Sequence, residues 1–333
     1  MTEEFILDIV DRTAKRREER RRFLRSAGAA GVGAAGLAIL SACGDDDDDA
    51  PAPAPTPTPP TSGVTDVDVL NFALQLEYLE AQFYSFAAFG TGLDAALLGG
   101  VGAAGQVSTA GTAPPRRVNF TDPVVAQYAR EIAADEIAHV RFLRTALGAA
   151  AGAQPAINIS GDANGSFTAA ARAAGVVGAN ATFDPYSSDE FFLLGAYIFE
   201  DVGVTAYKGA SPLITNKTFL EAAAGILAAE AYHAGLVRTV LYRKGVTNAA
   251  LRTIAGQISD ARDSLDGGSD LDQGIAGAAD VSNIVPADSN AIAFSRSPGQ
   301  VLNIVYLNRA AVSQGGFFPS GVNGSVRTSA ASG

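Results

Sequence analysis

The sequence predicts an all-α protein, in which four long helices form a bundle and a helical extension follows. Three observations predict this class. Apolar residues recur at a helical period in four long segments. Capping residues and glycines mark where these segments begin and end. No segment has a convincing strand pattern, and a hydrophobic fraction of 47% is enough to bury a core.

The first helix is expected at 66–89. Thr65 or Asp66 can cap its start, and Gly90 can end it. Its apolar residues recur every three or four positions, as on one face of a helix, at Val69, Phe72, Leu76, Leu79, Phe83 and Phe86.

The second helix is expected at 123–147, after a loop rich in Gly, Ala and Thr at 90–121. Asp122 is the expected N-cap, and Pro123 suits the first turn because its missing N–H has no partner there in any case. Gly148 stops the helix.

The third and fourth helices are expected at 188–208 and 217–244, after a second long, irregular connection at 148–186. Ser187 and Glu190 have the spacing of a capping box at the start of the third helix. Because the link between these two helices is short, they should be antiparallel neighbours.

Two shorter helices are expected at 248–264 and 298–313, the second with Ser297 as its cap. The globular part of the chain then divides into a four-helix bundle at 64–245 and a C-terminal extension at 246–333, made of helices and loops packed on the bundle.

The first 63 residues differ from the rest. In 1–43, a basic stretch precedes a short apolar run and small residues, which is the order found in export signals. Arg20 and Arg21, followed by Phe-Leu-Arg, resemble a twin-arginine signal, and Leu-Ser-Ala before Cys43 resembles a lipobox. The acidic and Pro-rich segment 44–63 is typical of a disordered tether.

These motifs predict a lipoprotein that leaves the cytoplasm by the twin-arginine route and is tethered to a membrane of the cell envelope or periplasm through Cys43. A basic tail with an incidental apolar helix is the alternative. The net charge of −11 argues against nucleic acid or an anionic lipid surface as a partner, and indicates solubility.

The chain has only two histidines, and each follows a glutamate by three residues. Glu136 precedes His139 in "DEIAHV", and Glu230 precedes His233 in "AEAYHA". Residues three apart on a helix share a face, so each pair can present one carboxylate and one imidazole to a single metal ion.

The other two long helices each offer an inward carboxylate, Glu77 or Glu80 in the first and Glu200 in the third. Tyr84 follows Glu77 by seven residues, and Tyr207 follows Glu200 by seven. Seven residues make two turns, so each tyrosine is expected beneath its own glutamate. This repeat favours Glu77 over Glu80. We interpret the tyrosines as core residues, with a redox role as the alternative.

One Glu from each of two helices, with Glu-x-x-His from the other two, is the ligand pattern of di-iron and di-manganese carboxylate bundles. The alternative is a bundle without metal, in which Asp135 and Arg141 or Arg238 form buried ion pairs. Four carboxylates converging with two imidazoles carry excess negative charge, however, and would repel one another or take up protons without cations. The pattern therefore favours metal.

On these residues the chain resembles the ferritin-like superfamily, and more narrowly the bacterial ferritin-like domain proteins related to plant desiccation-related proteins. The resemblance covers about residues 64–325, and it is carried by "NFALQLEYLEAQFY", "EIAADEIAHVRFLRTALG", "YIFEDVGVTAYKGASPLI" and "ILAAEAYHAGLVRTVL". It implies a ferritin-like four-helix bundle with long loop insertions and a C-terminal helical extension.

The resemblance also implies roles for the ligands. Glu136 and Glu230 would bridge two metal ions, Glu77 and His139 would complete one site, and Glu200 and His233 the other. Carboxylate-rich sites with one imidazole per metal suit iron(II) or manganese, so we expect two Fe ions, or alternatively two Mn ions.

A metal pair of this kind can react with O₂ or peroxide. We therefore expect iron(II) oxidation or catalase-like peroxide consumption, in protection against oxidative stress or desiccation. The alternative is a non-enzymatic envelope protein in which metal only stabilises the bundle. A storage cage is disfavoured by the tether and the insertions, and whether the chain forms a homo-oligomer stays open.

Overall fold

A computed structural model describes residues 63–107, 116–278 and 281–332. In these ranges the regular elements are helices, and β-structure is limited to isolated bridges. The all-α prediction is therefore confirmed. None of the helices in these ranges is both long and apolar enough to cross a membrane. Arg20, Arg21, Cys43 and the acidic, Pro-rich tether lie outside the described residues.

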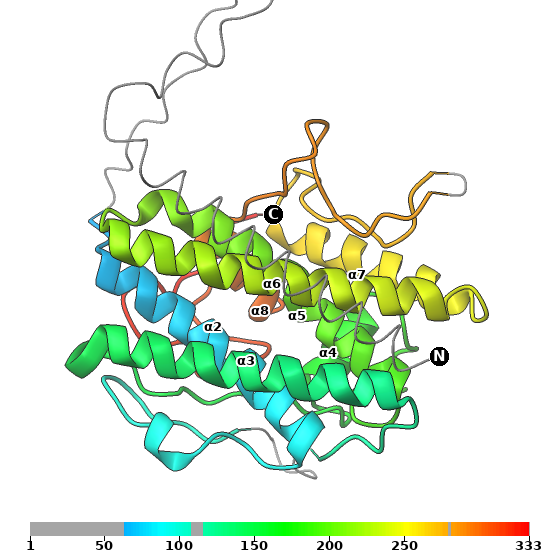
Figure 1. Ribbon diagram of the computed structural model, residues 1–333, viewed down its shortest axis with the longest axis horizontal. Helices are drawn as coiled ribbons and strands as arrows, with labels where there is room; N and C mark the ends of the chain where they lie inside the picture. Colours follow the sequence, from blue (N-terminus) through cyan, green and yellow to red (C-terminus); the bar gives the residue numbers. More distant parts are fainter. Residues whose placement is uncertain (1–62, 108–115, 279–280, 333) are drawn as a thin grey trace, which may run out of the picture. The chain divides into compact units, whose positions relative to one another are not determined.

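Four long helices form the bundle, and Figure 1 shows them together with α7 and α8. Their bounds are Asp66–Phe89 for α2, Pro123–Leu147 for α3, Asp189–Ala210 for α5 and Lys217–Lys244 for α6. Thr65 caps α2 in a capping box with Asp68, and Asp122 caps α3, as its sequence predicts.

The helices pack as two antiparallel pairs. Between α2 and α3, Arg144 donates to the hydroxyl of Tyr78, and Val118, just before α3, donates to the carbonyl of Ala87. Between α5 and α6, Lys244 contacts Glu190 at one end. Phe83 of α2 lies in the core of this bundle, where its ring contacts those of Tyr84, Phe167, Tyr186, Phe192 and Phe199.

Three helix assignments differ from the sequence prediction. Ser188, not Ser187, is the N-cap of α5, and its side chain accepts from the N–H of Phe191. The connection between α3 and α5 contains a short helix, α4 (Ser166–Ala173), that the sequence analysis missed. The last helix, α8, covers only Pro298–Val305 instead of 298–313.

A line of buried charges attaches the C-terminal extension to the bundle. The extension includes α7 (Ala250–Asp266) and α8, which pack against α5. Ion pairs with N···O distances of 2.5–2.9 Å link six side chains of alternating sign, in the order Arg238, Asp201, Arg262, Asp272, Arg296 and Asp266. All six side chains are buried, and their charges balance, three against three.

Candidate metal centre

The four long helices bring all six predicted ligands to one place inside the bundle. On α3 and on α6 the glutamate and histidine of each Glu-x-x-His pair point the same way because three residues make almost one turn. The antiparallel pairing sets α2 and α5 opposite these helices, and each contributes one more carboxylate. The side chain of His139 is half-buried. The other five are buried, namely Glu77, Glu136, Glu200, Glu230 and His233.

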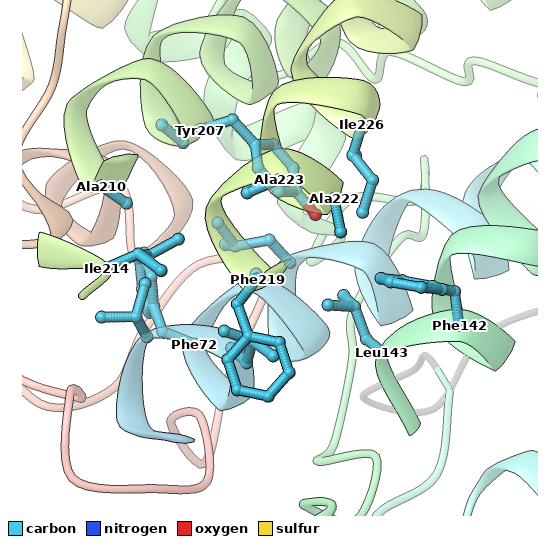
Figure 2. A pocket seen from close by; sticks show the side chains of 15 residues that line it. Phe72, Phe142, Leu143, Tyr207, Ala210, Ile214, Phe219, Ala222, Ala223 and Ile226 are labelled. Carbon is cyan, nitrogen blue, oxygen red and sulfur yellow. The ribbon is translucent and has the colours of Figure 1, made fainter. Parts of the chain in front are cut away.

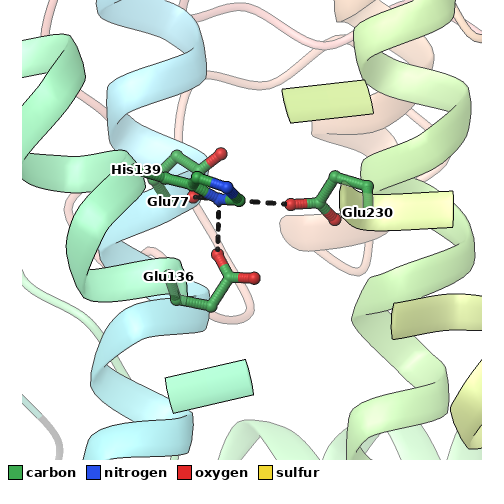
Figure 3. A group of neighbouring side chains, drawn as sticks. All are labelled: Glu77, Glu136, His139 and Glu230. Atoms are coloured by element: carbon green, nitrogen blue, oxygen red, sulfur yellow. Dashed lines mark ion pairs between the residues drawn. The ribbon is translucent and has the colours of Figure 1, made fainter. Parts of the chain in front are cut away.

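The first group of ligands surrounds the ring of His139, as Figure 3 shows. Its Nδ1 lies 3.3 Å from Oε2 of Glu77, 3.5 Å from Oε2 of Glu136 and 3.8 Å from Oε1 of Glu230. One ligand atom from each of these four residues falls within 4.8 Å of all the others. Three helices therefore converge on a space the size of one ion.

The second group lies beside the first and shares a residue with it. Nδ1 of His233 is 3.1 Å from Oε1 of Glu136 and 3.6 Å from Oε2 of Glu200. The two imidazole rings are 6.4 Å apart, centre to centre. Since the two oxygens of Glu136 face different groups, this carboxylate is placed to bridge two ions.

The chemistry of these atoms fits a metal pair. Within the described part of the chain, eight of their buried atoms have no hydrogen-bond partner: Oε2 of Glu77 and Glu200, both carboxylate oxygens of Glu136 and Glu230, and Nδ1 of both histidines. Leaving so many buried polar atoms unpaired is costly unless something else binds them. No Lys or Arg of the described ranges pairs with these carboxylates, and Arg238 pairs with Asp201 instead. In the described ranges the carboxylates therefore have only the two histidines as basic partners.

Burial shifts the acidity of the carboxyl groups. Burial first, and neighbouring carboxylates second, raise the pKa of Glu136 and of Glu230 well above the usual range. Burial also raises the pKa of Glu200 to about 7, although the nearby His233 acts in the opposite direction. Without metal, these groups hold protons that divalent ions would replace.

Glu77 behaves differently because it pairs with His139. Burial is the largest influence and acts to raise the pKa of Glu77, but the charge of His139 together with hydrogen bonds from neighbouring groups makes the net shift downward. Burial is the largest influence on His139 and acts to lower its pKa, but Glu77, Asp135 and Glu200 together make the net shift upward. The pair is thus the most charged part of the metal-free centre.

The two tyrosines reach across the bundle. The hydroxyl of Tyr84 on α2 donates to Glu200 on α5, and the hydroxyl of Tyr207 on α5 donates to Glu77 on α2. The sequence analysis placed each tyrosine two turns beneath the glutamate of its own helix, and the hydrogen bond of each goes to the glutamate of the other helix. The helices run antiparallel, so two turns along one helix lead to the level of the glutamate on the other.

Asp135, which the sequence analysis assigned only to ion pairing, contacts a candidate ligand of the site. Its Oδ2 lies 3.1 Å from Nε2 of His233, the ring nitrogen that faces away from the ligands. A carboxylate in this place fixes the orientation of a metal-binding imidazole and makes it a stronger ligand. In the sequence, its position directly before Glu136 is the feature that could have indicated this contact.

Two of the hollows beside the centre differ in character. An open depression between α3 and α6 reaches His233 and Asp135; its wall is mainly apolar, and Glu131, Tyr128 and Tyr232 also line it. The other hollow is an apolar pocket between α2, α5 and α6, with Phe142 and Leu143 of α3 on its far wall (Figure 2). Tyr207 lies in the wall of the apolar pocket, and its hydroxyl is turned to Glu77, so the pocket itself carries no free polar group toward the centre.

Comparison with known families agrees with this geometry. A family model for the ferritin-like domain matches residues 65–243, a range that contains all six ligands. The chain belongs to the ferritin-like domain family. The match begins one residue before α2 and ends one residue before the end of α6, so it coincides with the four-helix bundle.

Two curated proteins are similar to this ferritin-like protein over most of its length. The ferritin-like catalase Nec2 of Nesocodon mauritianus is 30% identical over 282 residues, which are 80% of this chain and 86% of the relative. The desiccation-related protein PCC13-62 of Craterostigma plantagineum is 28% identical over 272 residues, 78% of this chain and 83% of the relative. No solved structure matches the chain at a significant level.

Proposed function

We propose that this ferritin-like protein disproportionates hydrogen peroxide at a pair of iron or manganese ions held by its six buried ligands. The observation that carries the proposal is the set of eight buried ligand atoms without partners, arranged in two adjoining groups that share Glu136. The similarity to a protein named as a ferritin-like catalase supports peroxide as the substrate.

The reaction turns two molecules of H₂O₂ into one of O₂ and two of water. One peroxide accepts two electrons and two protons, and the other gives up the same numbers. A bound pair of iron or manganese ions supplies the two-electron change. The role of the protein is to hold the ions close together and to keep the carboxylates in place.

The surrounding residues fix the ligands. The hydroxyls of Tyr84 and Tyr207 orient Glu200 and Glu77, and Asp135 orients His233. The buried position of these groups keeps bulk water and larger reductants away from the centre. Peroxide and water, which are small and polar, would reach it through the open depression beside His233 and Asp135.

Metal analysis and oxygen release test the proposal together. The purified full chain should bind about two Fe or Mn ions, and the loaded protein should release one O₂ for every two peroxides consumed. Glu136→Gln should abolish both properties, because this carboxylate serves both groups. Glu221→Gln is the matched control, since this glutamate of α6 is exposed.

The other outcomes separate the alternatives. If the loaded protein oxidises iron(II) with O₂ but releases no O₂ from peroxide, the centre is a ferroxidase. If it binds two ions and turns over neither substrate, metal stabilises a non-enzymatic protein, as in the desiccation-protection alternative. Absence of bound metal from a folded protein would sink the proposal entirely.

We also propose that the chain acts in the cell envelope as a lipoprotein, on the signal-like residues Arg20, Arg21 and Cys43. A folded-state export route would allow the ions to be bound before the protein leaves the cytoplasm. Cys43→Ala should release the protein from the membrane fraction, and paired Lys in place of Arg20 and Arg21 should hold it in the cytoplasm. Unchanged fractionation of both variants would contradict the proposal.

A further inference from the structure

A seventh acidic side chain lies in the wall of the metal centre. Glu80 follows Glu77 by one turn of α2 and is only 7% exposed. Its carboxylate forms no hydrogen bond or ion pair within the ranges that the structure describes. A buried carboxylate without a partner costs free energy, so its presence needs a reason.

The place of Glu80 follows from the symmetry of α2 and α5. Each helix carries a glutamate and, seven residues later, the tyrosine that binds the glutamate of the other helix. Three residues after its glutamate, α2 has Glu80 and α5 has Gly203. Because the helices are antiparallel, these two positions face each other at the level between the two ligand groups.

Gly203 leaves space that two carboxylates enter. A Cβ at this glycine would overlap Oε2 of Glu230 and would lie 3.6 Å from Oε1 of Glu80. A glycine inside a helix costs about 1 kcal/mol relative to alanine. The missing side chain is therefore what allows Glu230 to take its place, and Glu80 lies in ordinary contact distance of the same space.

The second ligand group is one carboxylate short of the first. Among the residues that the structure describes, four side chains surround the first position and three, Glu136, Glu200 and His233, surround the second. Iron(II) and manganese(II) favour oxygen-rich coordination with more than three ligands. A further carboxylate close to this position would complete it.

No contact with a polar partner fixes the carboxylate of Glu80 in place within the described part of the chain. It is not part of either group, so it would have to turn toward the ions in order to bind. No hydrogen bond holds its carboxylate, and it borders a small, mainly apolar cavity of about 20 Å³ that is also lined by Gly203. An apolar pocket offers the carboxylate no partner, and a divalent ion offers it a strong one.

We propose that Glu80 is a seventh ligand, which binds the metal pair from the Gly203 side and completes the position formed by Glu136, Glu200 and His233. The inference rests on the metal centre of the proposed function. It does not require that the centre turns over peroxide.

The test compares metal binding to the full chain before and after Glu80→Gln, a change that keeps the size of the side chain. Calorimetric titration of the metal-free protein with Mn²⁺ should show two sites in the wild type. In the variant, one site should weaken at least about tenfold, by analogy with losses seen when groups around a metal site are removed. The electron paramagnetic resonance spectrum of the Mn²⁺ pair should change as well.

The melting temperature of the metal-free variant separates a ligand from a structural residue. Removing an unpaired buried carboxylate should leave this temperature unchanged or raise it, while the rise on adding Mn²⁺ becomes smaller. Glu80→Met, which suits the apolar pocket, is a second variant in case the amide disturbs folding. Glu221→Gln on the surface of α6 is the control and should match the wild type in both measurements.

Each outcome has a distinct meaning. If both Glu80 variants bind two Mn²⁺ ions with wild-type affinity and an unchanged spectrum, the inference is overturned. If the wild type binds two ions and consumes no peroxide, the proposed function fails while the role of Glu80 is still decided by affinity. If the folded wild type binds no ions, both fall together.

Discussion

The two histidines that hold the centre have different surroundings. Nε2 of His233 contacts Asp135, but the equivalent position before Glu230 is Ala229, which has no carboxylate to offer His139. The side chain of His139 is also the more exposed, at 13% against 6%. The two ions are thus expected to bind with different affinities, the tighter imidazole being the one that Asp135 orients.

Asp135→Asn tests this difference at a single residue. The amide can no longer act as a charged partner of His233, so the affinity of the ion beside it should fall about 10- to 100-fold. Calorimetric titration with Mn²⁺ should show one weakened site and one unchanged site. Glu131→Gln, one turn earlier on α3 and also lining the open depression, should leave both sites unchanged. Equal weakening in the two variants would mean that the charge of the depression matters and the contact with the imidazole does not.

The raised pKa of Glu200 predicts how the stability of the metal-free protein depends on pH. The folded protein keeps the proton of Glu200 up to about pH 7, whereas the unfolded chain loses it near 4.5. The folded state therefore binds more protons between these values, and its free energy of unfolding falls as pH rises, by roughly 3 kcal/mol for this group. Glu136, Glu230 and His139, whose pKa values are also raised, act in the same direction.

Urea unfolding of the metal-free protein at pH 5 and pH 8 measures this effect. Carboxyls with lowered pKa, such as Asp66, titrate below this range and do not oppose it. Glu200→Gln should reduce the difference between the two pH values. The affinity for metal should instead rise with pH, because ions displace protons more easily as pH rises. Greater stability of the metal-free wild type at pH 8 than at pH 5 would contradict the assignment of protons to these carboxyls.

At the scale of helices, two glycines differ in what surrounds them. Gly203 in α5 faces Glu230 and Glu80, whereas a Cβ on Gly225 in α6 would meet nothing within 4 Å. Both are interior helix positions, where alanine is favoured over glycine by about 1 kcal/mol. The same substitution should therefore have different consequences in the two helices.

Gly225→Ala should raise the free energy of unfolding by roughly 0.5–1 kcal/mol and leave metal binding unchanged. Gly203→Ala should push Glu230 out of its place, so that the melting temperature rises less on adding Mn²⁺. Thermal unfolding of both variants, with and without Mn²⁺, makes the comparison. If Gly203→Ala gains stability like Gly225→Ala and binds metal normally, the space beside Gly203 is not needed by the centre.

The sequence predicted the long helices because their signals are local. Thr65, Asp122 and Gly90 cap helices through contacts within one turn, which spacing alone reveals. The end of α8 is different. Asn303 is buried and donates to carbonyls of Asn308 and Ala330, and Leu307 takes a positive φ of 53°, so distant contacts stop the helix before its apolar pattern ends.

The candidate site shows the same division between local and distant contacts. Each Glu-x-x-His pair is a feature of one helix, and its two residues could be matched from spacing. The partner of each tyrosine depends on how α2 and α5 run against each other, which spacing within one helix does not fix. Glu80 was set aside for lacking a tyrosine at the right distance, yet burial places it beside Glu230 and Gly203.

At the scale of the whole molecule, two clusters of buried charge have opposite characters. The six-residue line from Arg238 to Asp266 is balanced in charge, and each of its side chains has an ion-pair partner within the protein. The metal centre has more acids than bases and many unpaired atoms. The two meet on α5, where Glu200 belongs to the centre and Asp201 to the charge line. The C-terminal extension therefore supports the helix that supplies a ligand.

This arrangement predicts that the extension is needed for the stability of the bundle. Arg296 is buried and holds both Asp266 and Asp272, with its Nε 2.5 Å and its Nη2 2.9 Å from their carboxylates. Arg296→Met leaves these carboxylates without that partner inside the protein, which should lower the free energy of unfolding by about 3–5 kcal/mol. Urea unfolding of the metal-free protein gives this value directly. Arg309→Met, at an exposed position of the same extension, should change it by less than about 0.5 kcal/mol.

A second substitution tells charge from size. Asp266 has Arg296 as its ion-pair partner in the described part of the chain, so adding Asp266→Leu to Arg296→Met removes the stranded charge and should recover part of the loss. If the double variant is instead as unstable as the sum of the two single variants, the side chains act by packing and not as a pair. If Arg296→Met unfolds at the wild-type urea concentration, the extension does not stabilise the bundle through this line of charges, and α5 must be held by its apolar contacts alone.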